Sequence, residues 1–158
     1  MAEHCATGAN AGGPSAASVY LDTSALVPYY RPEAASSAVE EYLRSAGQPL
    51  TLSRLTDVEL ASALNRLLQM GELEEPHLLL IEAAYLDDLR EGRFDLVALP
   101  PTAFARARLW LSERKLHLRT LDALHLAACR ELGAGLVTCD QALHAAALDL
   151  GMDSRLLR

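Results

Sequence analysis

Four acidic residues occupy the positions where an α/β protein usually keeps its chemistry. Asp22 and Asp140 each come directly after a short apolar run, as expected at the end of a buried strand in a parallel sheet. Ligands of open α/β sheets bind outside the carboxyl ends of the strands. Asp122 lies in the first turn of an expected helix, and Glu59 lies early in another. We therefore expect all four carboxylates to converge on one pocket.

Such a cluster of carboxylates predicts a divalent cation. Like charges raise one another's pKa, so a bare cluster would keep some of the acids protonated. Mg²⁺ or Mn²⁺ relieves the repulsion, because these ions prefer oxygen ligands and keep waters that a phosphate can displace. A metal ion of this kind polarises a phosphoryl oxygen, generates hydroxide and stabilises the leaving alkoxide. The cluster therefore suits hydrolysis of a phosphodiester bond.

Each acid also has a purely structural interpretation. Asp22 could cap the turn after its strand, and Asp140 could be the N-cap of the last helix. Asp122 in a first helical turn is favoured by the helix dipole alone. Glu59 could be an ordinary half-exposed acid on a helix surface. Spacing and pattern leave both interpretations open.

The elements that must position these acids alternate along the chain. Two prolines, Pro28 and Pro32, mark a loop after the first strand. Thr102 is expected to N-cap its helix. The predicted strands are 19–21, 50–53, 94–99, 136–139 and a short edge strand at 154–157, and the predicted helices are 33–46, 54–70, 75–90, 102–114, 121–132 and 141–150. Alternation of this kind is typical of a mostly parallel sheet with right-handed crossovers.

Length and composition set the broad class. A chain of 158 residues with 51% hydrophobic residues suits one domain with its own core. Residues 1–17 are small and Gly-rich, so we expect a flexible N-terminal leader followed by a folded domain over 18–158. No apolar run approaches the roughly 18–20 residues that a membrane span needs.

Charge and cysteine content narrow the function. The net charge of −7 counts against a broad basic nucleic-acid footprint, although a few arginines beside a metal site could still meet a phosphate. Three cysteines without a C-x-x-C spacing argue against a disulfide framework and a zinc site. They fit a reducing compartment, so we expect a cytoplasmic protein.

Four short motifs carry a family resemblance. They are D-T-S-A-L at 22–26, V-E-L-A-S-A-L at 58–64, L-D-A-L-H-L-A at 121–127 and T-C-D-Q-A-L at 138–143. In this order they resemble the motifs of PIN-domain proteins, most closely of VapC-type toxins, over about residues 18–157. The resemblance implies a PIN-like three-layer α/β/α sandwich with a central, mostly parallel sheet. It also implies a metal-dependent endoribonuclease that is the toxin of a type II toxin–antitoxin pair.

The same resemblance implies a set of residues and partners. The acidic quartet of the family falls on the four acids described above, Asp22, Glu59, Asp122 and Asp140, as catalytic metal ligands for Mg²⁺ or Mn²⁺. Its strand-end hydroxyl, also catalytic, falls on Thr138, and Ser24 is a plausible helper at the substrate. The implied partners are an RNA substrate, a VapB-type antitoxin and a second copy of the chain.

Basic and imidazole side chains are secondary candidates. Arg31 and Arg119 are placed to contact substrate phosphates, although each could be an ordinary surface residue. His125 lies one turn after Asp122 and could be a general base or a hydrogen-bonded structural residue. The helices at 75–90 and 102–114 carry more apolar residues than one sheet face needs. One of them is therefore expected to form a self-associating surface.

Two other classes of protein compete with the nuclease. In a phosphatase or receiver-type domain Asp22 would be the nucleophile or phospho-acceptor. The haloacid type of phosphatase has a second Asp two positions later, where this chain has Ser24. In a non-catalytic binding module the acids would hold a partner's arginines. A nucleotide-binding fold is unsupported, since the chain has neither G-x-G-x-x-G nor G-K-[ST].

Overall fold

The computed structural model describes residues 18–47 and 49–158, so the predicted leader at 1–17 lies outside the described residues. In this part of the chain five strands form one parallel sheet in the order β3-β2-β1-β4-β5. They are β1 (Val19–Leu21), β2 (Leu50–Ser53), β3 (Phe94–Val97), β4 (Gly135–Thr138) and β5 (Ser154–Leu156). The prediction of a mostly parallel sheet is confirmed, and the predicted edge strand is β5.

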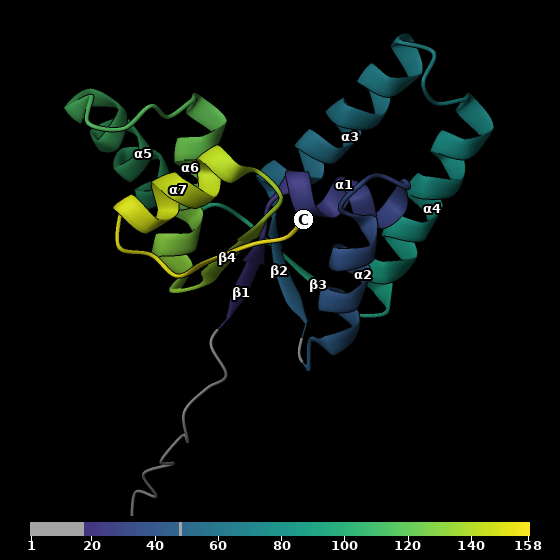
Figure 1. The fold of residues 1–158 in the computed structure, drawn as a ribbon, viewed down its shortest axis with the longest axis horizontal. Helices are drawn as coiled ribbons and strands as arrows, with labels where there is room; N and C mark the ends of the chain where they lie inside the picture. The colour runs from purple at the N-terminus through teal and green to yellow at the C-terminus, as the bar shows by residue number, and fades with distance from the viewer. Residues whose placement is uncertain (1–17, 48) are drawn as a thin grey trace, which may run out of the picture.

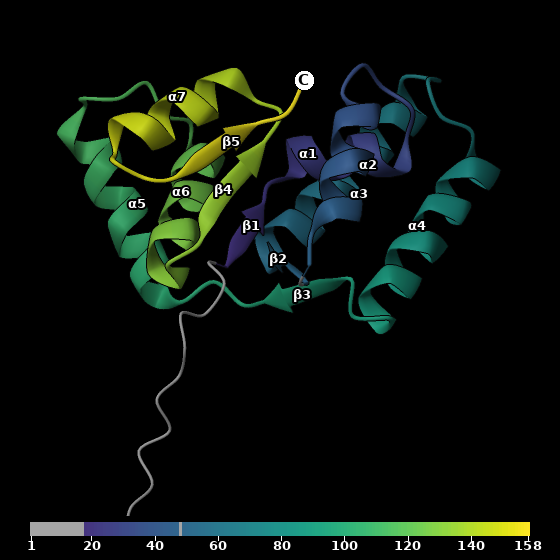
Figure 2. The ribbon, with the colours of Figure 1, turned by 60° about the horizontal axis from the view of Figure 1, so that its bottom comes forward.

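The helices cover both faces of this sheet. They are α1 (Thr23–Tyr30), α2 (Ser36–Ser45), α3 (Arg54–Gln69), α4 (Glu75–Arg90), α5 (Pro101–Glu113), α6 (Thr120–Leu132) and α7 (Gln141–Asp149). Figures 1 and 2 show α5, α6 and α7 gathered on one side of the strands and α1 to α4 on the other. The molecule is thus the three-layer α/β/α sandwich that the sequence predicts. None of the helices in the described residues has the length and apolarity that a membrane crossing requires.

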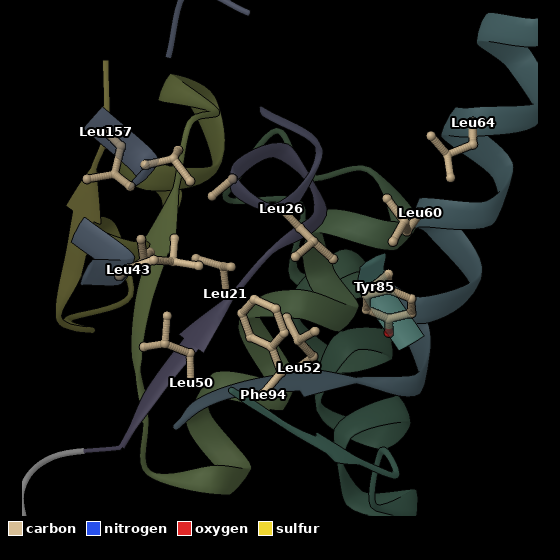
Figure 3. Close-up of a cluster of buried hydrophobic side chains, with 13 residues drawn as sticks. Leu21, Leu26, Leu43, Leu50, Leu52, Leu60, Leu64, Tyr85, Phe94 and Leu157 are labelled. Atoms are coloured by element: carbon tan, nitrogen blue, oxygen red, sulfur yellow. The ribbon is translucent and has the colours of Figure 1, made fainter. Parts of the chain in front are cut away.

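Each face of the sheet has its own hydrophobic core, because successive strand residues point to opposite faces. Leu21 and Leu52 face the core beneath α1 to α4, where Tyr85 and Phe94 join them (Figure 3). Tyr20, next to Leu21 in the chain, packs instead into the core beneath α6 and α7. Tyr20 and Leu21 have no exposed surface, so β1 is buried on both faces of the sheet, and all residues of β2 are buried as well.

The segment after β1 differs from the prediction. The sequence predicts a loop at 28–32, but helix α1 covers residues 23–30 and has Pro28 inside it. Proline in a helix interior removes a backbone hydrogen bond and is unfavourable. Here burial of Ala25, Leu26 and Pro28 outweighs that cost, and the Ser36 hydroxyl donates to the Pro28 carbonyl at 2.6 Å. The next helix therefore begins at Ser36 and not at residue 33.

The start of α5 also corrects a prediction. Thr102 is not its N-cap: the helix begins at Pro101, and the capping position is Pro100, which makes no side-chain hydrogen bond. Proline suits the first helical position because its fixed φ is already helical and its missing N–H would be unpaired there anyway. The helix therefore starts at a proline and has no side-chain cap.

The end of α6 gives a test of the fold. Gly133 closes this helix in the left-handed conformation, with φ 62°, and nothing lies within 4 Å of the position of an added Cβ. The cost of Gly133→Ala is therefore conformational, about 1 kcal/mol of unfolding free energy. Urea denaturation measures it. Gly47→Ala is the control, because Gly47 has equally open space and no positive φ; equal losses in both variants would contradict the assignment.

Candidate active site: an acidic pocket at the sheet edge

A pocket of about 600 Å³ opens where the strand order of the sheet reverses. From β1 the chain proceeds to β2 and β3 on one side, and only later to β4 on the other. Loops that leave β1 and β4 therefore diverge and open a crevice at the carboxyl ends of these strands. The pocket is lined by all four predicted acids, Asp22, Glu59, Asp122 and Asp140. They come from four different segments of the chain.

Asp22 sits at the bottom of this pocket as the N-cap of α1. Its Oδ1 accepts hydrogen bonds from the Ala25 amide at 3.3 Å and from the Ser24 hydroxyl at 2.9 Å. The residue is only 4% exposed. Burial raises the pKa of the Asp22 carboxyl above its usual range, although the His125 imidazole and the Ser24 hydroxyl act in the opposite direction. A cation that approaches a buried acid of this kind stabilises its ionised form.

Asp140 and Asp122 are also held by helix starts. Asp140 caps α7, with its Oδ1 accepting from the amides of Ala142 at 2.7 Å and Leu143 at 3.0 Å. Asp122, at the third position of α6, accepts from the Arg119 amide through Oδ2 at 3.1 Å. Asp22 and Asp140 are thus helix caps, as the structural interpretation holds. Both residues also line the pocket, so capping a helix does not prevent either acid from belonging to the site.

Glu59 reaches the pocket from the first half of α3. Its Oε2 accepts hydrogen bonds from the Thr23 hydroxyl at 2.7 Å and from His125 Nε2 at 2.5 Å. Partial burial by itself raises the pKa of the Glu59 carboxyl. The hydrogen bond and the charge of His125, together with the Thr23 hydroxyl, outweigh burial and leave this pKa below its usual range. Glu59 is therefore held as a carboxylate.

The four acids share one feature of hydrogen bonding. Each uses a single carboxylate oxygen for the contacts just given, and no side-chain hydrogen bond within the described residues reaches the other oxygen. No fully buried side-chain oxygen or nitrogen in the described residues lacks a partner, so the free oxygen of the buried Asp22 must be open to the pocket. One oxygen of each acid fixes the side chain and the other remains available to a ligand.

This donor set fits a hard divalent cation, because only oxygen atoms are offered. No three His, Cys, Asp or Glu side chains in residues 18–47 and 49–158 stand close enough together to hold one ion directly. Mg²⁺ keeps several waters and is usually held by one or two carboxylates. The residues present therefore match a hydrated ion better than an all-protein cage.

Two hydroxyls link the segments that carry Asp22 and Asp140. The Ser24 hydroxyl donates its proton to Asp22, so the Thr138 hydroxyl, 3.0 Å away, must donate to Ser24 Oγ. Thr138 Oγ1 in turn accepts from the Asp140 amide at 2.9 Å. Ser24 lines the pocket, whereas Thr138 has no exposed surface and does not. The structure thus places the predicted catalytic hydroxyl of Thr138 behind the acids.

The two predicted arginines lie in different surroundings. Arg119 lines the pocket, but Arg31 does not: it pairs with Glu33 at 3.0 Å and Glu72 at 3.6 Å. Arg66, which the sequence analysis missed, does line the pocket. The spacing of Arg66 in the sequence could have identified it, because a residue seven positions after Glu59 lies two turns further along the same face of α3.

The fold and this pocket define an α/β protein with an oxygen-rich ligand site at the switch point of its sheet. A family model described as the PIN domain matches residues 19–148. Ribonuclease VapC46 of Mycobacterium tuberculosis is 34% identical over 141 residues, which cover 86% of this chain and 95% of that protein. The chain therefore belongs to the PIN-domain family, and its curated relative is of the VapC type.

Solved structures agree on the fold. VapC20 of Mycobacterium tuberculosis, described as a toxin that cleaves the sarcin–ricin loop, superposes with a TM-score of 0.64 at 18% identity, covering 82% of this chain and 95% of that one. FitAB bound to a DNA fragment gives a TM-score of 0.66 at 17% identity, covering 87% and 94%. VapBC2 of Rickettsia felis, bound to promoter DNA, gives 0.62 at 13% identity, covering 89% and 98%.

Proposed function

We propose that this protein is a metal-dependent endoribonuclease that hydrolyses RNA phosphodiester bonds and is the toxin of a toxin–antitoxin pair. The observation that carries the proposal is the pocket in which four carboxylates each leave one oxygen free, beside Arg66 and Arg119. The relative at 34% identity is named a ribonuclease, which supports RNA as the substrate class. The PIN-domain match favours this reading over a phosphatase or receiver domain.

The side chains divide the work of such a reaction. Asp22, Glu59, Asp122 and Asp140 would hold hydrated Mg²⁺ or Mn²⁺, directly or through its waters, and the ion when bound polarises the phosphoryl oxygen and lowers the pKa of water. Helix caps and hydroxyls fix the direction of each carboxylate before any substrate arrives. Arg119 and Arg66 supply positive charge at the rim, where the phosphates of an RNA strand would lie.

Cleavage of a mixed RNA pool tests this proposal directly. Purified protein with Mg²⁺ or Mn²⁺ is expected to cut the pool, and EDTA is expected to abolish the cutting. A comparison in Mg²⁺ and then Mn²⁺ shows which ion supports the faster reaction. The protein is first checked for a bound second polypeptide by mass spectrometry. Antitoxin-free protein that binds RNA but cuts nothing with either metal would contradict the enzyme and favour the binding module.

The two rim arginines should bind RNA through its phosphates. Arg66→Ala and Arg119→Ala are each expected to weaken RNA binding and to lower the slope of log K against log salt by about 1. Fluorescence anisotropy measures both quantities, in an Asp22→Asn background so that the RNA stays whole. Arg31→Ala is the matched control, because Arg31 is already paired with two glutamates. An unchanged salt slope in all three variants would contradict phosphate contacts at the rim.

The exposed apolar surface of α4 and α5 supports a proposal about the protein partners of this chain. We propose that a VapB-type antitoxin and a second copy of the chain cover exposed apolar side chains on α4 and α5, which include Leu79, Leu80, Phe104 and Leu109. Solved structures with a similar fold include toxin–antitoxin complexes, among them one from Klebsiella pneumoniae. Light scattering at micromolar concentration is expected to report a dimer, and a monomer there would contradict the self-association.

A further inference from the structure

A chain of buried hydrogen bonds leads from the core on the α6 side of the sheet to the acidic pocket. The Tyr20 hydroxyl lies 2.8 Å from His125 Nδ1, and the other ring nitrogen, Nε2, lies 2.5 Å from Glu59 Oε2. Ser53 and Thr56 contact the same tyrosine oxygen at 2.7 Å and 3.3 Å. Tyr20 comes from β1, His125 from α6 and Glu59 from α3, so these hydrogen bonds join three elements of the fold.

The direction of these bonds follows from chemistry. A carboxylate can only accept, so the hydrogen between His125 and Glu59 must sit on Nε2, whether the ring is neutral or charged. A tyrosine phenol, with an ordinary pKa of about 10, keeps its proton at neutral pH, and the Tyr20 hydroxyl lies within hydrogen-bond distance of Nδ1. His125 is 3% exposed and both of its nitrogens are occupied. It therefore has no free lone pair with which to take a proton from water in the pocket.

We propose that His125, oriented by Tyr20, is a positioning residue that clamps one oxygen of Glu59 so that the other faces the divalent cation. Glu59 Oε2 accepts two hydrogen bonds, one from Thr23 of α1 and one from His125 of α6. A glutamate has three side-chain torsions, and the clamp removes that freedom before the metal arrives. The inference rests on the proposed metal site, and it rules out His125 as the general base.

The test measures metal binding without RNA. Mn²⁺ affinity is followed by electron paramagnetic resonance in the full chain. His125→Leu removes the Nε2 donor and is expected to weaken Mn²⁺ binding about 10- to 100-fold, the usual loss when a partner of a metal ligand is removed. His125→Gln places an amide N–H near the same point and should bind Mn²⁺ within about threefold of the native protein. His144→Leu is the control, because His144 bonds to Ser154 and does not line the pocket.

Two further measurements keep the proposal testable if His125→Leu fails to fold. Tyr20→Phe keeps the aromatic ring and removes only the hydroxyl, so a loss of about threefold in Mn²⁺ affinity is expected. Nitrogen-15 NMR of the native protein is expected to show His125 with a hydrogen on Nε2. A neutral ring with its hydrogen on Nδ1 alone would overturn the proposal.

Cleavage kinetics separate a positioning role from a chemical one. If His125 acts through Glu59, saturating Mn²⁺ should restore most of the kcat of His125→Gln and Tyr20→Phe; a kcat that stays low at saturation would overturn the proposal. Native Mn²⁺ affinity in both His125→Leu and Tyr20→Phe would also overturn it, with the nuclease standing. Failure of the native protein to bind Mn²⁺ at all would instead overturn the proposed function.

Discussion

Asp22→Asn is expected to lower RNA cleavage at least about 100-fold while raising the stability of the metal-free protein. The first effect follows because a bound metal lowers the barrier by several kcal/mol, and each 1.36 kcal/mol is tenfold in rate. The second follows because the Asp22 carboxyl is 4% exposed and burial raises its pKa. Asparagine fits the same space, carries no charge and is as good an N-cap as aspartate for α1.

The gain in stability has a defined pH dependence. The folded protein holds the Asp22 proton more tightly than the unfolded chain, whose pKa is about 3.8. The contribution of this group to stability is therefore largest below that value and is lost as pH rises through the higher folded pKa. Thermal unfolding in EDTA should show Asp22→Asn above the native protein at pH 7, with the difference shrinking towards pH 3.5.

Asp22→Ala is the control for these measurements. It removes the charge and the cap together, so it should be less stable than Asp22→Asn by about 1 kcal/mol, with equally low activity. The difference between the two substitutions isolates the helix cap from the charge. Native rates of cleavage in Asp22→Asn, with the fold intact by circular dichroism, would end the four-acid model.

The sheet and its acidic edge could be predicted from the sequence because both depend on local signals. Short apolar runs ending in Asp22 and Asp140 mark parallel strands, and such strands bring their carboxyl ends together whatever lies between them. The alternation of strands and helices then predicts the layers. These inferences needed no knowledge of side-chain contacts.

The errors arose where tertiary contacts overrule a local preference. Proline normally ends a helix, but α1 continues through Pro28, which is buried in the fold. Arg31 and Arg66 have the same chemistry, and their difference lies in neighbours: Arg31 is taken up by Glu33 and Glu72, whereas Arg66 faces the pocket. For His125 the sequence left two roles open, because its contact with a tyrosine 105 positions away in the chain is one that no sequence period predicts.

Mn²⁺ is expected to stabilise the native protein strongly, because it binds the folded acids and not the unfolded chain. Metal at 100 times its dissociation constant adds about 2.7 kcal/mol to the free energy of unfolding. For a chain of 158 residues this corresponds to a rise in Tm of about 5 to 10 °C. Differential scanning fluorimetry measures the rise, with NaCl at equal ionic strength to separate site binding from general screening.

Asp140→Asn gives this measurement its sharpest comparison. Asparagine can still accept the amides of Ala142 and Leu143, so α7 keeps its cap and the metal-free Tm should change little. With the asparagine oxygen held by these two amides, the atom that replaces the free oxygen of Asp140 is an amide nitrogen, which donates hydrogen bonds and does not bind a cation, so the Mn²⁺-dependent rise should fall to less than half. An undiminished rise would place the cation elsewhere. Loss of the rise with an unchanged metal-free Tm would separate two roles of this residue, the capping of α7 by one oxygen and the proposed contact of the other oxygen with the metal.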